Sequence, residues 1–315
     1  MKPARIAILA GGLSLERDVS LRSGRRVAEA LTERGHSVTT LDLGDELVAT
    51  LAADSPDLVY LALHGKAGED GTVQNLLDLL SVAYTGSGAV ASALAWDKVV
   101  AKGLYRRAGL STPDWVAISS SAIRDMGAGA ALARIPEALG GAVVVKPAQG
   151  GAALGVRVVG GPDELPSALL TALNYADVAL VERFIEGREV AVSVVDDVVL
   201  PPVEVVPRNG RYDFAARYTA GQADLHAPAR LEPPILRRCE EVAASAMSVA
   251  GCRDVARADL IVDDDGTPWL LELDTCPGMT ETSLLPAAAA AAGWTLPDLC
   301  ERVVGAARRR QTNQR

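Results

Sequence analysis

Residues 141–159 read GAVVVKPAQGGAALGVRVV, a run that predicts two strands joined by a glycine-rich loop. The continuous apolar stretch Ala142–Val145 is typical of a buried strand, and Lys146 follows it at once. Glycines at positions 150, 151 and 155 free the loop backbone to close around a ligand, and backbone N–H groups in such loops can hold phosphate. The loop has no serine or threonine, so two interpretations stay open: a phosphate site without hydroxyls, or a flexible turn.

The composition is that of a folded, acidic protein. The chain has 315 residues, of which 49% are apolar and only 4% aromatic, so we expect two or three domains with cores of Ala, Val and Leu. The formal net charge of −9 repels a phosphate backbone, which argues against a nucleic-acid partner. No apolar stretch approaches the ~20 residues of a membrane span, so we expect no membrane partner.

The chain start and the cysteines favour a cytoplasmic location. The apolar run after the basic start is only about five residues long and the acidic LERD follows it, so we interpret it as a strand rather than a signal peptide. The thiols are widely spaced, without a CxxC pair, which predicts reduced and mostly buried side chains at Cys239, Cys252, Cys276 and Cys300.

Strands alternate with helices in the first part of the chain. Apolar runs predict strands at 5–12, 37–43 and 57–65, and helical spacing predicts helices at 13–35 and 72–80. This alternation is typical of a doubly wound α/β layer, whose ligands gather at the carboxyl ends of the strands.

The rest of the chain divides near residue 180. Before it we expect a helix at 98–109, the strand–loop–strand unit and a helix from about Pro162. After it we expect two strands within 178–195, a polar stretch, and helices at 233–250 and 287–292. The basic tail at 308–315 is interpreted as a solvated, frayed end.

An acidic pattern lies on a predicted hairpin, 259–274, with its turn at Asp265–Gly266. Glu272 and Asp274 are two residues apart and share a face, which Asp259 on the partner strand can join. Carboxylates at this density suit Mg²⁺, held together with substrate phosphates. The alternative is a solvated acidic edge.

Other familiar motifs are missing. Lys146 precedes the glycines, so this is no Walker sequence, and AGGLS at the first strand does not match GxGxxG. A hydride-transferring enzyme is therefore a poor interpretation. There is no GxSxG elbow and there are three histidines, which disfavours a Ser-His-Asp hydrolase.

Longer motifs carry a resemblance that covers residues 5 to 305. In chain order they are GGLSLERDVSLRSG, LALHGKAGEDGTVQNLLDLL, YTGSGAVASALAWDK, VVVKP, VERFIEGREV, YDFAARYTAG, ARADL and LLELDTCPGMTETSL. They resemble the motifs of D-alanine–D-alanine ligases, ATP-grasp enzymes of peptidoglycan precursor synthesis. HGKAGEDG and PGMTETSL are especially specific to that family.

The resemblance implies a three-domain ATP-grasp ligase of α/β class. Its expected parts are an N-terminal α/β substrate domain (1–97), a central ATP-grasp subdomain with the glycine loop as lid (98–179) and a C-terminal subdomain with the metal and substrate site (180–315). The implied activity joins two small amino acids through an acyl phosphate, with D-alanine as both substrates. ATP is the implied co-substrate, with two Mg²⁺ ions, or Mn²⁺ in their place. A homodimer is the assembly that the resemblance implies.

The resemblance also implies roles for individual residues. The nucleotide would contact Lys98, Lys146, Gly151, Ala152, Glu182, Arg183, Ile185, Glu189 and Arg217. The metal ions would be bound by Asp259, Glu272 and Asp274. The amino acids would contact Glu16, His64, Ser283 and Leu284. Catalysis would involve Glu16, Tyr218, Arg257 and Gly278, of which Glu16 fixes the first ammonium, Tyr218 helps to close the site and Gly278 serves the oxyanion.

The chain departs from the family pattern at five of these or neighbouring positions. Ala152 and Ala153 stand where the family has adjacent serines, one for phosphate and one for a hydrogen-bonded trio with Glu16 and Tyr218. An aspartate, Asp274, replaces an asparagine, and Arg183 and Arg217 replace lysines. The alanines leave open a paralogue that joins other amino acids, or a nucleotide-binding protein without ligase activity. The tyrosine at 218 speaks against a depsipeptide-forming variant.

Overall fold

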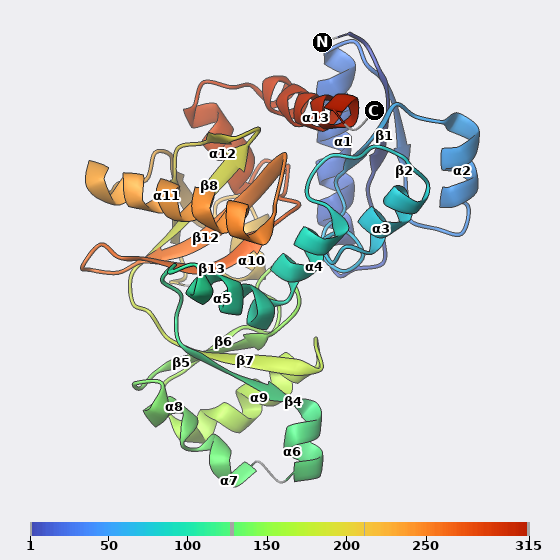
Figure 1. Ribbon diagram of the computed structural model, residues 1–315. Coiled ribbons are helices and arrows are strands. Elements are labelled where there is room, and N and C mark those ends of the chain that lie inside the picture. Colours follow the sequence, from blue (N-terminus) through green and yellow to red (C-terminus); the bar gives the residue numbers. More distant parts are fainter. Residues whose placement is uncertain (1, 127–128, 211, 314–315) are drawn as a thin grey trace.

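The computed structural model describes residues 2–126, 129–210 and 212–313, which form three sheets with helices around them (Figure 1). Their strand orders are β2-β1-β3, β4-β7-β5-β6 and β11-β10-β8-β12-β13, with β9 added beside β8. Within these ranges, no helix combines the length and the apolar character needed to cross a bilayer.

The first sheet is parallel, and its central strand is buried on both faces. Its strands are β1 Arg5–Leu9, β2 Ser37–Leu41 and β3 Leu58–Leu61. On β1, Ile6 and Ile8 enter one core cluster, whereas Ala7 and Leu9 enter another, as a continuous apolar run predicts. The surrounding helices are α1 Arg17–Glu33, α2 Leu47–Asp54, α3 Thr72–Leu79 and α4 Ala89–Trp96.

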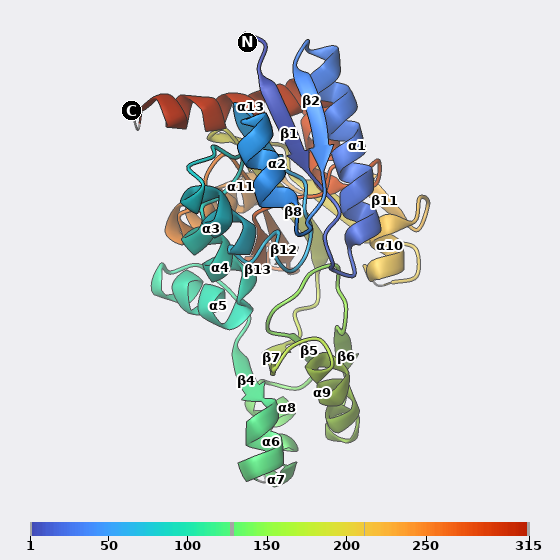
Figure 2. The ribbon, with the colours of Figure 1, turned by 90° about the vertical axis from the view of Figure 1, so that its right-hand side faces the viewer.

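The second sheet is antiparallel and lies at the lower end of the molecule in Figures 1 and 2. Its strands are β4 Trp115–Ser119, β5 Val143–Pro147, β6 Arg157–Val159 and β7 Val178–Arg183, reached through α5 Lys98–Arg107. Its helices are α6 Ser120–Met126, α7 Gly129–Leu132, α8 Ile135–Ala138, the 3-10 turn Pro162–Glu164 and α9 Leu165–Leu173. The expected boundary at 179/180 falls inside β7, and strand pairing assigns all of β7 to this sheet.

The third sheet holds the predicted acidic hairpin. Its strands are β8 Arg188–Val195, β9 Val198–Val199, β10 Val203–Pro207, β11 Ala223–His226, β12 Val255–Val262 and β13 Pro268–Asp274. Along β8, Val192 and Val194 face a cluster with α11 Pro233–Ala250, while Ala191 and Val195 face a cluster with α12 Leu284–Ala291. The alternation of side chains across the strand thus serves two cores.

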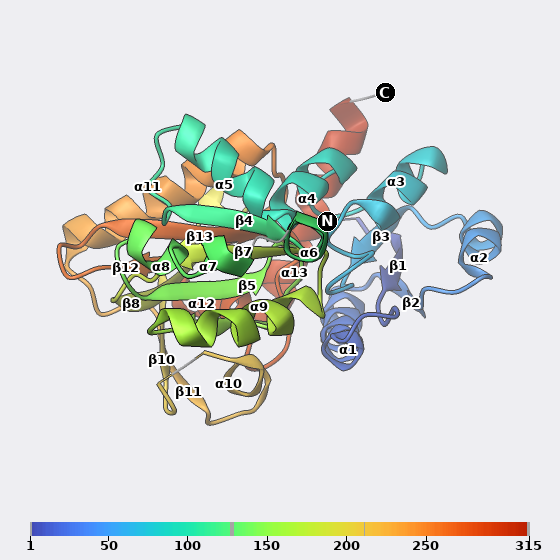
Figure 3. The ribbon, with the colours of Figure 1, turned by 90° about the horizontal axis from the view of Figure 1, so that it is seen from below.

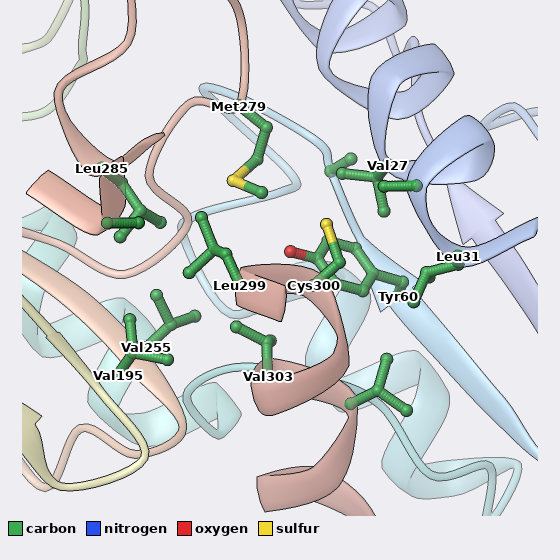
Figure 4. Packing of buried hydrophobic residues seen from close by; sticks show 14 of the residues in the cluster. Val27, Leu31, Tyr60, Val195, Val255, Met279, Leu285, Leu299, Cys300 and Val303 are labelled. Atoms are coloured by element: carbon green, nitrogen blue, oxygen red, sulfur yellow. The ribbon is translucent and has the colours of Figure 1, made fainter. Parts of the chain in front are cut away.

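The last helix, α13 Leu296–Asn313, ties the two ends of the chain together, since it packs against α1. Figure 4 shows its Leu299, Cys300 and Val303 between Tyr60 of β3 and Val195 of β8. The N-terminal and C-terminal parts therefore share one core, and Figure 3 shows them side by side from below. The four thiols are free, and all but the half-buried Cys252 are buried, as predicted.

The prediction of a frayed basic tail is wrong for its first residues. Arg308, Arg309 and Arg310 continue α13, because their side chains find partners in the folded chain. The guanidinium of Arg309 pairs with Asp196, and that of Arg310 donates to Asp254 at 2.6 Å and to the Tyr84 carbonyl at 2.7 Å. Residues 314–315 lie outside the described residues.

Candidate active site

The expected site residues come together around two adjoining cavities. The larger, about 270 Å³, lies between the second and third sheets and is lined by Lys98, Lys146, Gly151, Glu182, Arg183, Ile185, Glu189, Arg217, Asp259, Glu272 and Leu284. The smaller, about 70 Å³, is lined by Glu16, His64, Lys98, Gly151, Ala152, Arg217, Tyr218, Arg257, Glu272, Asp274, Gly278, Ser283 and Leu284. Five expected residues line both cavities: Lys98, Gly151, Arg217, Glu272 and Leu284. What each residue binds stays a prediction.

The start of α5 places Lys98 where the cavities meet. Asp97 caps this helix by accepting hydrogen bonds from the Val99 and Val100 amides. The Lys98 amine donates to the Gly150 carbonyl at 2.7 Å and pairs with Glu272 at 3.1 Å. One cation thus contacts both the glycine loop and the acidic hairpin.

Lys146 is the last but one residue of strand β5 and lies beside Glu182 of β7. The Lys146 amine and the Glu182 carboxylate are 2.5 Å apart, and both side chains are buried. Burial alone would raise the pKa of Glu182, but Lys146 and a second lysine, Lys102, lower it. The carboxylate is therefore ionised between two cations.

The predicted acidic hairpin forms, with Asp259 opposite Glu272 and a shift of register between Asp259 and Leu260. Between its carboxylates lies Arg257, which donates to Asp259 at 2.6 and 2.9 Å and pairs with Asp274 at 3.0 Å. Burial would raise the pKa of Glu272, but Lys98, Lys146 and Arg217 outweigh it and lower this pKa to about 2. Among the described residues, no three His, Cys, Asp or Glu side chains are grouped tightly enough to hold a metal by themselves.

The glycine loop between β5 and β6 lies directly against Glu16. A Cβ atom placed on Gly151 would be 2.7 Å from the Glu16 carboxylate, so a larger residue would force the carboxylate or the loop to shift. Ala152 and Ala153 follow with φ of 54° and 56°, the left-handed region that costs a side-chain-bearing residue about 1 kcal/mol or more each. The loop closes on Glu16 through its backbone.

Glu16 precedes α1 and is buried to 6% exposure. Burial and the nearby Glu69 raise its pKa to about 7. The Tyr218 hydroxyl, from α10 Phe214–Tyr218, donates to the Glu16 carboxylate at 3.1 Å. The glycine loop, α10 and the start of α1 thus meet at the Glu16 carboxylate.

The larger cavity is lined by apolar side chains and by Glu189. Its lining includes Val144, Val158 and Phe184, a surface suited to a flat base. Burial raises the pKa of Glu189 to about 7. Lys98 and Lys146 line the same cavity, which therefore has both apolar and cationic walls.

Three residues of the site were missed by sequence reasoning. Glu69 accepts a hydrogen bond from the Gly65 amide at 2.9 Å and lies 3.8 Å from His64, and its place in HGKAGEDG was the available signal. Tyr212 lines both cavities, with the Arg217 guanidinium 4.5 Å from its ring centre. Lys102 lies one helical turn beyond Lys98, and only that spacing pointed to it.

Comparisons with known proteins identify the family of the chain. Residues 104–305 match the family model of the D-ala D-ala ligase C-terminus, and residues 45–87 match that of the N-terminus. The chain is 43% identical over 303 residues to a D-alanine–D-alanine ligase of Anaeromyxobacter sp. (strain K), with 96% of each chain covered. A ligase of the same name from Geobacter sulfurreducens is 43% identical over 305 residues, covering 96% of this chain and 94% of the relative.

Solved structures give the same result for the fold. The D-alanine–D-alanine ligase of Bacillus anthracis superposes with a TM-score of 0.85 at 30% identity, covering 99% of both chains. Its complex with ATP gives a TM-score of 0.82, covering 98% of this chain and 99% of the other. The ATP-grasp fold predicted from the sequence is confirmed. The chain belongs to the D-alanine–D-alanine ligase family.

Proposed function

We propose that this protein joins two D-alanine molecules into D-alanyl-D-alanine and converts ATP to ADP and phosphate in the process. The observation that carries the proposal is the junction of the two cavities at Lys98, Arg217 and Glu272. The larger cavity combines apolar walls with lysines, which suits a base and its phosphates, and the smaller one is polar and suits amino acids. The junction is where a terminal phosphate and a carboxylate would meet.

The first step brings two anions together. The carboxylate oxygen of the first amino acid attacks the γ-phosphorus, ADP leaves, and an acyl phosphate forms. Lys98, Lys146 and Arg257 would neutralise this charge, and electrostatic stabilisation of this kind is commonly the largest contribution to catalysis. Glu16, when ionised, would hold the first substrate's ammonium in the smaller cavity.

The second step forms the amide bond. The second amino acid's ammonium loses a proton, its neutral amine attacks the acyl carbon, and phosphate leaves. Ser283 and Leu284, at the start of α12, would contact its carboxylate, and Gly278 would face the oxygen that gains charge. The glycine loop over Glu16 would keep water from the acyl phosphate.

The carboxylates of the hairpin fit magnesium by their chemistry. Asp259, Glu272 and Asp274 offer only oxygen donors, and Mg²⁺ commonly takes one or two carboxylates together with substrate phosphates and water. Their present partners are Arg257 and Lys98, side chains that nucleotide phosphates can draw away. Bound Mg²⁺, or Mn²⁺ in its place, would neutralise phosphate charge and orient the γ-phosphate.

The alanines of the lid motivate a second candidate, a ligase with a different second substrate. The family relatives include the VanG D-Ala:D-Ser ligase of Enterococcus faecalis, 26% identical with a TM-score of 0.82, so this fold accommodates a change of second amino acid. We further propose a cytoplasmic homodimer, as the family resemblance implies, which sedimentation of the purified protein tests.

Phosphate release tests the function directly. The protein is given ATP, magnesium and one or two members of a panel of D- and L-amino acids, and product masses are measured. Release with D-alanine alone and a product of D-alanyl-D-alanine mass is the expected result. Release only when a second, different amino acid is present would favour the second candidate, and no release with any pair would contradict both.

A further inference from the structure

Lys102 of α5 is a lysine buried completely beneath the larger cavity. Its exposed fraction is 0%, and its amine donates to the Thr112 hydroxyl at 2.7 Å and to Glu182 at 3.0 Å. The amine also lies 5.2 Å from the centre of the Trp115 ring. Burial lowers the pKa of Lys102 to about 8, against the opposing effect of Glu182. A buried cation of this kind persists only where partners compensate for lost water.

The ion pair between Lys102 and Glu182 joins two hydrophobic cores. Ala101 and Tyr105, on either side of Lys102 in α5, belong to the cluster of the third sheet. Val181, next to Glu182 in β7, belongs to the separate cluster of the second sheet. Lys102 therefore holds the strand that carries Glu182 to the helix that carries Lys98.

The charges of Lys102, Glu182 and Lys146 set the net charge of the cavity wall that the nucleotide would meet. One Glu182 oxygen is 2.5 Å from Lys146 and the other is 3.0 Å from Lys102. Two lysines and one glutamate leave a net charge of +1, whereas Lys146 and Glu182 alone would be neutral. Lys146 and Glu182 line the larger cavity, while Lys102 stays behind them.

We propose that Lys102 is a positioning residue for the nucleotide, which acts through Glu182 to keep Lys146 in place and the cavity wall positively charged. This inference rests on the proposed function. It assigns Lys102 an effect on ATP affinity without contact between Lys102 and ATP. The smaller cavity, which Lys102 does not line, is left unaffected.

Two substitutions and a control separate charge from packing. Lys102→Gln keeps a donor for Glu182 but removes the charge, and Lys102→Arg keeps the charge. Arg106→Met is the matched control, because Arg106 lies on the same helix and 4.1 Å from the centre of the same ring but pairs with the exposed Asp114. Binding of ATP in the presence of magnesium chloride is measured by calorimetry, with Tm recorded for each variant.

Lys102→Gln is expected to weaken ATP binding about tenfold, the effect of losing one charged interaction. Its KM for D-alanine at saturating ATP should stay within twofold of the wild type, and Arg106→Met should bind ATP as the wild type does. Lys102→Arg should bind ATP more tightly than Lys102→Gln. If Lys102→Gln binds ATP with wild-type affinity, the inference about Lys102 is overturned but the proposed function is not. If the wild type binds no ATP, both are overturned. If Lys102→Gln does not fold, Lys102→Arg decides: a Tm near wild type with tenfold weaker ATP binding than the wild type would contradict the charge argument.

Discussion

The Tyr218 hydroxyl donates a hydrogen bond of 3.1 Å to the Glu16 carboxylate, across 202 positions of the chain. This bond joins α10, in the polar stretch after β10, to the start of α1. The glycine loop has no serine to join this bond, and its Gly151 lies nearest the other oxygen of the same carboxylate. At the smaller cavity, α10 and the glycine loop thus converge on Glu16.

Tyr218→Phe removes this hydrogen bond and little else. One hydrogen bond to a charged group contributes about 1.5 kcal/mol or more, so we expect KM for D-alanine at the first site to rise about tenfold. Initial rates at saturating ATP measure this effect. Tyr175→Phe is the control, since Tyr175 lines neither cavity, and an equal rise in both variants would contradict the role of Tyr218.

The raised pKa of Glu16 predicts how binding and stability depend on pH. Its pKa is about 7 against an ordinary value of 4.5, so the folded protein keeps a proton between these pH values that the unfolded chain has released. The contribution of Glu16 to the free energy of unfolding is therefore greatest below pH 4.5 and falls as the pH rises towards 7. Glu16→Gln should raise Tm more at pH 8 than at pH 5, which thermal scans at the two pH values check.

The same titration acts in the opposite direction on binding. The substrate ammonium requires the ionised Glu16 carboxylate, so KM for D-alanine should fall as the pH rises through 7. This dependence should be absent in Glu16→Gln. A pH profile of KM that is the same in both proteins would show that another group controls it.

Gly151→Ala tests the close approach of the lid. The added Cβ would lie 2.7 Å from the Glu16 carboxylate, so either the carboxylate or the loop must shift, and the first-site KM should rise about tenfold or more. Gly160→Ala is the control, because its Cβ would meet nothing within 4 Å. Similar kinetics of the two variants would mean that the loop does not close on Glu16 during turnover.

Ala152→Ser with Ala153→Ser tests the lid's missing hydroxyls. Serine at 152 would stand beside Glu16 in the smaller cavity, and a new hydrogen bond there should lower KM for D-alanine or ATP about fivefold. Kinetics and product masses of the double variant are compared with those of the wild type. Unchanged values for both would mean that the alanines are neutral, whereas a changed product would place substrate choice in this loop.

Much of the fold follows from local sequence. The helix expected at 233–250 is α11 Pro233–Ala250, because proline starts it and Gly251, with φ of +70°, ends it. The hairpin predicted around the Asp265–Gly266 turn forms, but Asp259 comes opposite Glu272 only after a register shift between Asp259 and Leu260 that local sequence does not predict. Pairing between distant strands is not encoded locally, which is why the boundary placed at 179/180 divides β7.

The site was predictable where a motif marks it and hidden where only packing does. Lys98, Lys146 and Glu16 stand in motifs and line the cavities as expected. The position of Arg257 between Asp259 and Asp274 depends on strand register, and the burial of Lys102 depends on how α5 meets the second sheet. Neither relationship can be obtained from spacing along the chain.

The central claim is tested most directly by product formation from ATP and D-alanine, with Glu272→Gln and Lys146→Ala measured beside the wild type. The wild type should release phosphate and yield D-alanyl-D-alanine only with magnesium present, and both variants should lose most turnover at low ATP. Wild-type protein that binds ATP but yields no dipeptide from D-alanine, or variants that keep full activity at low ATP, would contradict the account.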